Sequence, residues 1–246
     1  MKDLKKNLIE YCQEKNIENQ VSWFCFNPSS NETELYRENE IYLAASTIKV
    51  AVCMAWVDLI EKGIVTADTK LQFLERHYEE SDEKALYHSY QFGDWVPLRE
   101  CMELAIIYSD NPSNHMMREY YAQFGNQTFR EWFAKFSKEP VSQEFYTTNQ
   151  TTAAIMLEVM KELYSHEDKY AEIIEYMKCA AKGRYIQANH FAFEVAQKYG
   201  EYEQFEHTIA ILYREQPLLV GIYTELAHEN AKEVIRDLSK IMAENA

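Results

Sequence analysis

The amino-acid sequence predicts an α/β (α+β) fold: an antiparallel five-stranded sheet flanked by N- and C-terminal helices, with an inserted all-helical lobe. Three observations support this prediction. Apolar residues alternate with period two near both ends of the chain, which is typical of strands. Between residues 46 and 183 they recur at helical spacing, and amphipathic patterns occupy both termini. Strands at the two ends with helices between them favour a sheet in which the ends meet.

The chain begins with an amphipathic helix and two strands. Leu4, Leu8, Tyr11 and Cys12 recur at helical spacing, without the apolar run of a signal peptide. The stretch "VSWFCFNP", residues 21–28, is rich in aromatic and branched side chains and ends in Asn-Pro, which predicts a strand and its stop. The stretch "ETELYRENEIYLAAS", residues 32–46, is expected to form a second strand.

The middle of the chain predicts several helices separated by Gly, Pro, Asn and Ser. The stretch "AASTIKVAVCMAWVDLI", residues 44–60, is almost wholly apolar, which indicates a helix that is buried on all sides. Residues 96–109, 113–125, 129–136 and 151–166 also show helical spacing.

Three strands and a helix are expected to close the chain. Residues 191–200, 204–215 and 217–226 alternate with period two, with "YGEYEQ" and "REQP" as turns, and residues 229–245 are amphipathic. The expected organisation is a single discontinuous domain, residues 1–246. Its sheet lobe would comprise 1–45 and 190–246, its helical lobe 46–189, and a cleft would lie between the lobes.

Charge and cysteine content restrict the possible functions. Forty acidic against 25 basic residues give a formal charge of −15, which argues against nucleic acid and anionic membrane surfaces as partners. No apolar run approaches the length of a membrane span. If Met1 is the native start, the absence of a leader predicts a cytoplasmic protein. No pair of cysteines has metal-ligand spacing, so we predict free thiols at Cys12, Cys25, Cys53, Cys101 and Cys179.

A serine and a lysine lie on the apolar segment. Ser46 and Lys49 are three residues apart, which on a helix separates their Cβ atoms by about 5–6 Å. Apolar neighbours give Lys49 little water, and burial favours a neutral amine, which can act as a base toward a nearby hydroxyl. The alternatives are an ordinary N-cap at Ser46 and a Lys49 side chain that extends to the surface.

Two further strings carry polar side chains at breaks in the pattern. "SDN", residues 109–111, lies between two predicted helices, and "KYG", residues 198–200, ends a predicted strand. Functional side chains often occupy such breaks, and glycine permits close approach of backbone. Asp110 is interpreted as a turn former. Each string alone is weak, because Ser-x-x-Lys also occurs at Ser81 and Lys84 in a charged stretch interpreted as solvated surface.

In this order the three strings resemble the signature of class A β-lactamases and penicillin-binding proteins, which is Ser-x-x-Lys, Ser-Asp-Asn and Lys-Thr-Gly. The likeness continues through "LRECMELAIIYSDNPSNHMM" and "HTIAILYREQPLLVGIYTEL". The resemblance implies a β-lactamase/transpeptidase-like fold. It also implies a serine hydrolase that acts on a small-molecule or peptide-like substrate, such as a β-lactam, through an acyl-serine intermediate, with no metal or cofactor.

The resemblance assigns catalytic roles to four residues. Ser46 would attack a carbonyl and become acylated, with Lys49 as the base or as the partner of the base. Ser109 would relay a proton to the leaving nitrogen. Lys198 would support Ser109 electrostatically and meet a substrate carboxylate.

Substrate binding would involve Asn111, Tyr199, Gly200 and Glu201. Asn111 would hold the amide side chain of the substrate, and the N–H groups of Ser46 and Glu201 would form the oxyanion hole. The family has threonine where this chain has Tyr199, and usually a small residue where it has Glu201. If the Glu201 carboxylate faces the cleft without a partner, it would repel the carboxylate of penicillins, which are then expected to be poor substrates.

The region that releases the acyl group in class A enzymes is the second place where this sequence differs from the family. Class A enzymes activate water with the glutamate of a Glu-x-x-Leu-Asn loop, and the corresponding region here, residues 136–152, is shorter. Within it "EPVSQ" imitates the loop, with Ser142 and Gln143 replacing Leu and Asn, and Glu139 and Glu144 are both conceivable bases. Without such a base an acyl-enzyme would persist. The alternative function is a catalytically silent relative that binds a small molecule or a partner protein in the same cleft.

The histidines are interpreted mainly as structural. His190 and His207 lie on or near predicted strands and are either structural residues or part of the cleft lining. His115 is expected to pack on its helix together with Met116 and Met117.

Overall fold

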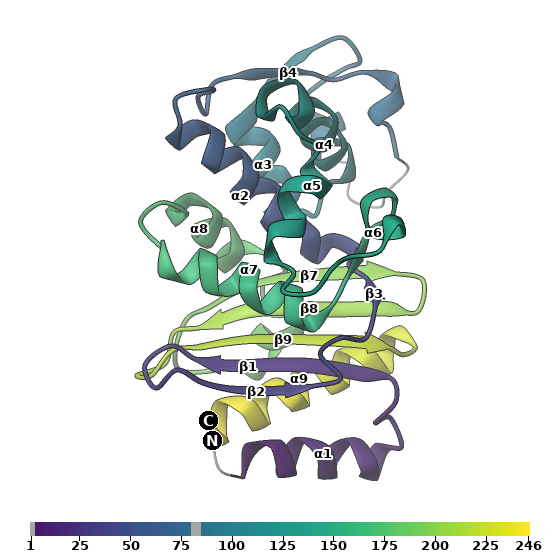
Figure 1. Ribbon diagram of the computed structural model, residues 1–246, viewed down its shortest axis with the longest axis vertical. Helices are drawn as coiled ribbons and strands as arrows, with labels where there is room; N and C mark the ends of the chain where they lie inside the picture. Colours follow the sequence, from purple (N-terminus) through teal and green to yellow (C-terminus); the bar gives the residue numbers. More distant parts are fainter. Residues whose placement is uncertain (1–2, 80–84) are drawn as a thin grey trace.

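The computed structural model describes residues 3–79 and 85–246; the second Ser-x-x-Lys pair, Ser81 and Lys84, lies outside them. A five-stranded antiparallel sheet, in the order β2-β1-β9-β8-β7, crosses the molecule (Figure 1). The sheet joins strands from the two ends of the chain, because β1 pairs with β9. The predicted fold class is therefore confirmed. The strands are β1 (Val21–Asn27), β2 (Glu32–Tyr36), β7 (Val195–Tyr202), β8 (Phe205–Leu212) and β9 (Leu218–Glu225).

Helices cover both faces of the sheet (Figure 1). On one face lie α1 (Leu4–Lys15) and α9 (His228–Asn245); on the other, α7 (Ala153–Ser165) contacts β1, β8 and β9, and α8 (Ala171–Cys179) contacts β7. Ile209 of β8 belongs to the core on the helical side, and its neighbour Ala210 to the core on the α1/α9 side. The period of two in the sequence thus reflects burial on both faces.

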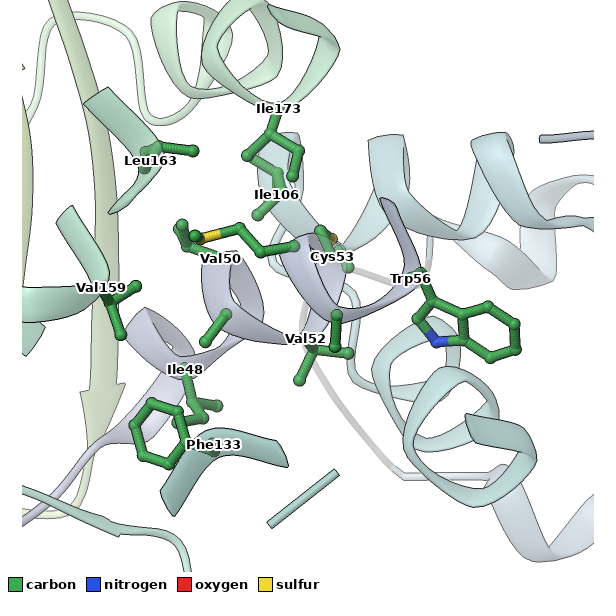
Figure 2. Close-up of a cluster of buried hydrophobic side chains, with 14 of the residues drawn as sticks. Ile48, Val50, Val52, Cys53, Trp56, Ile106, Phe133, Val159, Leu163 and Ile173 are labelled. Atoms are coloured by element: carbon green, nitrogen blue, oxygen red, sulfur yellow. The ribbon is translucent and has the colours of Figure 1, made fainter. Parts of the chain in front are cut away.

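Helix α2 (Ile48–Glu61) forms the centre of the helical lobe. Figure 2 shows its side chains enclosed by Ile106, Phe133 and Val159, which come from three other helices. A helix that is apolar on all sides is stable only when it is surrounded in this way. Its neighbours include α3 (Leu98–Ile107), α4 (Asn111–Gly125), α5 (Phe129–Phe133) and α8.

Two predicted elements need correction. Residues 32–46 are not one strand, because the chain turns at Arg37, which has a left-handed backbone (φ 46°), and resumes as β3 (Tyr42–Leu43) in a separate ladder.

The middle region is not wholly helical either. It contains two short ladders, too short to produce a recognisable period. The elements not yet given are α6 (Gln143–Thr147), β6 (Gln150–Thr151), β4 (Lys70–Gln72), β5 (Trp95–Pro97), and 3₁₀ turns at Ala45–Thr47, Glu75–His77, Leu86–His88, Ala134–Phe136 and Tyr185–Asn189.

The hairpin between β7 and β8 also differs from the prediction. The strand does not end at Gly200 but continues to Tyr202, and the chain reverses at Glu203, which has φ 51°. Lys198 and Gly200 therefore lie inside an edge strand that is paired with β8 along its whole length. Their positions are fixed by the sheet rather than by a loop.

All five cysteines are free, as predicted, and only Cys179 is exposed. Burial raises the pKa of the Cys12 and Cys25 thiols to about 12, which keeps both in the unreactive thiol form. None of the helices in residues 3–79 and 85–246 combines the length and the apolar composition needed to cross a membrane.

Two titratable neighbours are buried on β8. His207 donates from Nε2 to Leu43 O (2.8 Å) and accepts from Thr224 N at Nδ1 (3.1 Å), and burial lowers its pKa to about 4. The adjacent Glu206 lies opposite Glu201, and burial raises its pKa to about 7. His207 is thus a neutral structural residue that attaches β3 to the sheet. His190 is exposed at the end of the Tyr185–Asn189 turn.

The two shifts predict opposing contributions to the pH dependence of stability. Glu206 stabilises the fold fully below its unfolded pKa of 4.5, and this contribution is lost as the pH rises through about 7. His207 contributes fully above its unfolded pKa of 6.5, and this contribution is lost as the pH falls through about 4. We expect Glu206→Gln to remove the first effect. The unfolding free energy of this variant, relative to wild type, should rise by up to about 3 kcal/mol between pH 4.5 and 7.

Urea denaturation of both proteins across this pH range measures the difference. The matched variant His207→Asn should show the opposite slope, with its relative stability falling as the pH rises. A difference between Glu206→Gln and wild type that does not vary with pH would contradict a raised pKa at Glu206.

Candidate active site

Ser46 lies in the 3₁₀ turn Ala45–Thr47 that connects β3 to α2. No side-chain cap hydrogen bond forms at the start of this turn or of α2, so Ser46 is not an N-cap. Ala45 has a left-handed backbone (φ 45°), which is uncommon for residues other than glycine, and its carbonyl accepts from Asn149 Nδ2 at 3.2 Å. This turn places Ser46 on the wall of a cavity of about 310 Å³.

Lys49 lies one turn further along α2 and is only 1% exposed, so it does not extend to the surface. Its Nζ donates to Ser109 O (2.5 Å) and to Asn111 Oδ1 (2.6 Å), and lies 3.3 Å from Ser109 Oγ. Lys198 Nζ, also fully buried, donates to the same Ser109 Oγ at 3.0 Å. The structure thus brings side chains from α2, the α3–α4 turn and β7 together beside Ser46.

The turn between α3 and α4 holds Ser109 in position. Ser109 itself has a left-handed backbone (φ 59°). Asp110 is buried and caps α4, since one carboxylate oxygen accepts from Ser113 N (2.8 Å) and Ser113 Oγ (2.6 Å), and the other from Leu86 N (3.2 Å). Its carboxylate is occupied by the turn, as predicted. The strained conformation of Ser109 is therefore maintained by surrounding contacts.

Gly200 allows β7 to pass directly beside the backbone of Ser46. A Cβ at position 200 would lie 2.6 Å from Ser46 N, 2.9 Å from Thr47 N and 3.0 Å from Ala45 Cβ. No side chain fits there. The next residue, Glu201, lines the same cavity as Ser46.

Tyr199 and Glu201 both have partners outside the cavity. The Tyr199 ring stacks on Tyr185, with centroids 5.0 Å apart, and lies 4.0 Å from Lys198 Nζ; it packs in the core on the α1/α9 side and does not line the cavity. The Glu201 carboxylate accepts from Tyr185 OH and from Arg184 Nη2 (3.3 Å). The condition for repelling penicillins, an unpartnered Glu201 carboxylate, is therefore not met.

Three residues on one wall of the cavity, Asn114, His115 and Arg118, were not predicted from the sequence as site residues. Asn111, Asn114, His115 and Arg118 recur at helical spacing along α4 and line the cavity, facing Glu79. His115, expected to pack on its helix, is half-buried on α4, and its Nε2 lies 3.1 Å from Glu79 Oε2 at the cavity wall. Met116 and Met117 are buried as expected. The helical spacing of these residues from Asn111 was the sequence feature that could have identified them.

The loop before α7 places its two glutamates outside the Ser46 cavity. Glu139 and Glu144 are exposed, and neither lines the Ser46 cavity. Asn149 does line it, and its buried Oδ1 has no hydrogen-bond partner within the described residues. If Asn149 occupies the place of the asparagine in Glu-x-x-Leu-Asn, the residue four positions earlier is the buried Phe145. No carboxylate of this loop therefore reaches Ser46.

Metal coordination has no support in this geometry. Over residues 3–79 and 85–246, no group of three or more His, Cys, Asp or Glu side chains could hold a metal ion. The polar groups that line the cavity are hydroxyl, amine, amide, guanidinium and imidazole groups and the carboxylates of Glu79 and Glu201.

Comparisons with known proteins identify the family and the fold. A family model described as the β-lactamase enzyme family matches residues 3–246. The solved structure of PBP-A superposes with a TM-score of 0.82 at 16% identity, covering 99% of this chain and 96% of that one. A mutant of PBP-A in an acyl-enzyme complex with penicillin G gives 0.84 at 16% identity with the same coverage. The class A β-lactamase of the last common ancestor of Gram-negative bacteria gives 0.81 at 18% identity, covering 98% of each chain. No curated protein matches the sequence.

Proposed function

The chain belongs to the β-lactamase enzyme family, and on this basis we propose that it is a serine hydrolase that cleaves an amide or ester through an acyl-Ser46 intermediate. One observation carries the proposal: Lys49 and Lys198 both contact the Ser109 hydroxyl, at 3.3 and 3.0 Å, beside the cavity that Ser46 lines. A nucleophile, a base and a proton relay in this proximity are the groups that acyl transfer requires. The substrate is a β-lactam or another small peptide-like compound.

Acylation proceeds by attack of Ser46 Oγ on the substrate carbonyl carbon. As this O–C bond forms, the Ser46 proton passes to Lys49, and the carbonyl electron pair moves onto oxygen, which accepts from the N–H groups of Ser46 and Glu201. When the C–N bond breaks, Ser109 gives its proton to the leaving nitrogen and is reprotonated by Lys49. In sum, Ser46 loses one proton and the leaving nitrogen gains one by way of Lys49 and Ser109, both of which are restored.

The protonation states follow from the shared contact on Ser109. Two ammonium groups beside one hydroxyl would repel each other, which favours the neutral form of one amine. Lys49 suits the neutral form, because two of its N–H bonds go to Ser109 O and Asn111 Oδ1. Ser109 Oγ can then donate to the Lys49 lone pair while it accepts from a charged Lys198. In this arrangement Lys49 is ready to take a proton before substrate arrives.

Release of the acyl group is slow in this proposal. With Asn149 taken as the asparagine of the family motif, Phe145 takes the place of the water-activating glutamate, and the carboxylates at 139 and 144 do not line the cavity. The buried Asn149 Oδ1 can accept from a water, but an amide oxygen cannot remove its proton. The acyl-enzyme therefore accumulates.

Intact mass measurement after incubation with benzylpenicillin tests the proposal. We expect wild-type protein to gain the mass of one penicillin and to retain it after excess compound is removed. Ser46→Ala should gain nothing, whereas the control Ser29→Ala, in the exposed turn after β1, should behave like wild type. Rapid hydrolysis without a retained adduct would contradict slow release. No Ser46-dependent adduct with penicillins, cephalosporins or a fluorophosphonate would favour a binding protein without catalysis.

A further inference from the structure

Arg118 is a cation on the wall of the Ser46 cavity, and no carboxylate of residues 3–79 and 85–246 forms an ion pair with it. It lies on the same face of α4 as Asn111 and His115, which line the same cavity. Within residues 3–79 and 85–246 its guanidinium has no hydrogen-bond or ion-pair partner and lies 5.8 Å from the centroid of the Phe129 ring. Burial lowers its pKa, yet an arginine remains charged at neutral pH.

A shortage of acidic residues does not explain this. The chain has 40 acidic against 25 basic residues, and two basic side chains near Arg118 have a carboxylate partner. Arg76 binds both carboxylate oxygens of Glu119 at 2.5–3.1 Å, and His115 contacts Glu79 at 3.1 Å. Leaving a charge partly desolvated and unpaired is costly, so such a group indicates an anion that arrives with a ligand.

A second arginine increases the positive potential at this end of the cavity. Arg118 and Arg130 line an adjoining depression of about 330 Å³. Arg130 is buried and donates to Phe145 O (2.7 Å) and Gln150 O (3.0 Å), and it too has no carboxylate partner among the described residues. Burial and the proximity of Arg118 lower the pKa of Arg130 to about 10. An anion between the two guanidinium groups would relieve their repulsion.

The position of Arg118 indicates which part of the substrate carries the anion. Asn111 and Arg118 are seven residues apart on α4, which corresponds to about 10 Å along the axis. In the proposed function Asn111 meets the amide of the acyl part, and Ser109 and Lys198 meet the leaving group. A group bound at Arg118 therefore belongs to the acyl part, several bonds beyond the reacting carbonyl.

We infer that the preferred substrate has a carboxylate at the far end of its acyl part, as in a dicarboxylic acyl chain or an acidic amino-acid residue, and that Arg118 binds this carboxylate. The inference rests on the proposed function and specifies its substrate class. A guanidinium pairs with a carboxylate through two parallel hydrogen bonds, which gives both affinity and orientation. Glu79 lines the same cavity, but its carboxylate contacts His115 at 3.1 Å, and no ion pair joins it to Arg118 within the described residues.

Two matched compounds test the inference: a penicillin with an adipoyl side chain, and the same penicillin with the terminal carboxylate converted to a primary amide. The rate constant of Ser46 acylation is measured by intact mass for each. We expect wild type to react with the acid about 10–100-fold faster than with the amide. In Arg118→Gln this ratio should fall to about one, and Arg118→Lys should retain part of it. The control Arg99→Gln, whose arginine pairs with Asp68 on the surface of the same lobe, should keep the wild-type ratio.

The outcomes separate this inference from the proposed function. Equal, Ser46-dependent rates for the two compounds in wild type would overturn the inference and leave the acyl-serine mechanism standing. A ratio that survives in Arg118→Gln would also overturn it. If neither compound acylates Ser46, the proposed function fails, and the shift in melting temperature then measures binding alone. The acid should stabilise wild type more than Arg118→Gln, and equal stabilisation would overturn the inference.

Discussion

Lys49→Met is expected to slow acylation of Ser46 by about 10²–10⁴-fold, the range lost when a positioned general base is removed. Methionine has a similar length and no polar atom that can accept the Ser46 proton. It suits the apolar surroundings that Val50, Cys53 and their neighbours on α2 create. Ser109 O and Asn111 Oδ1 lose a donor, so a modest loss of stability should accompany the loss of rate.

A conservative variant distinguishes a base from a fixed charge. Lys49→Arg keeps the positive charge but cannot give up its proton, so it should be nearly as slow as Lys49→Met. Rates of fluorophosphonate attachment, measured with urea denaturation as a check on folding, compare the variants with wild type. If Lys49→Arg is folded and acylates within tenfold of wild type, Lys49 acts through its charge, and a group other than Lys49 accepts the Ser46 proton.

The long elements were predictable because burial imposes a period on every residue in them. Helix α2 is enclosed on all sides and reads as continuously apolar, and β8 places successive residues in two different cores. The ladder between β3 and β6 joins only Tyr42–Leu43 to Gln150–Thr151. Two residues cannot show a period, and their pairing depends on how a segment a hundred residues away folds. Such elements are fixed by tertiary contact rather than by local sequence.

The same distinction applies to the candidate site. Ser46, Ser109 and Lys198 were found because each lies in a short string with its own chemical signature. Arg118 and Asn149 belong to no string, and they reach the cavity only through the direction of α4 and the course of a loop. The partners of Glu201 were equally inaccessible, since Arg184 and Tyr185 approach it from a turn that the sequence pattern did not reveal. Whether the Glu201 carboxylate has partners depends on how side chains from this turn are placed at the edge of the sheet.

Gly200→Ala is expected to reduce the acylation rate by about 10²–10³-fold, the cost of losing one oxyanion-hole donor. The added methyl group would lie 2.6 Å from Ser46 N and 2.9 Å from Thr47 N, closer than carbon and nitrogen approach. Because these atoms belong to the backbone of a tight turn, β7 must move away from Ser46. That movement separates the N–H groups of Ser46 and Glu201, which are proposed to share one oxygen. The pairing of β7 with β8 faces away from the clash, so the sheet should survive.

A second substitution identifies the atoms responsible for the clash. Ala45→Gly removes the third close contact, at 3.0 Å, and relieves the left-handed backbone at that position, but it leaves both nitrogen atoms in place. Gly200→Ala combined with Ala45→Gly should therefore remain slow. Recovery of the rate in the double variant would mean that the clash is with the Ala45 side chain alone. A folded Gly200→Ala protein that acylates at the wild-type rate would show that the close passage of β7 does not position the oxyanion donors, and the oxyanion pair would then have to be sought elsewhere around Ser46.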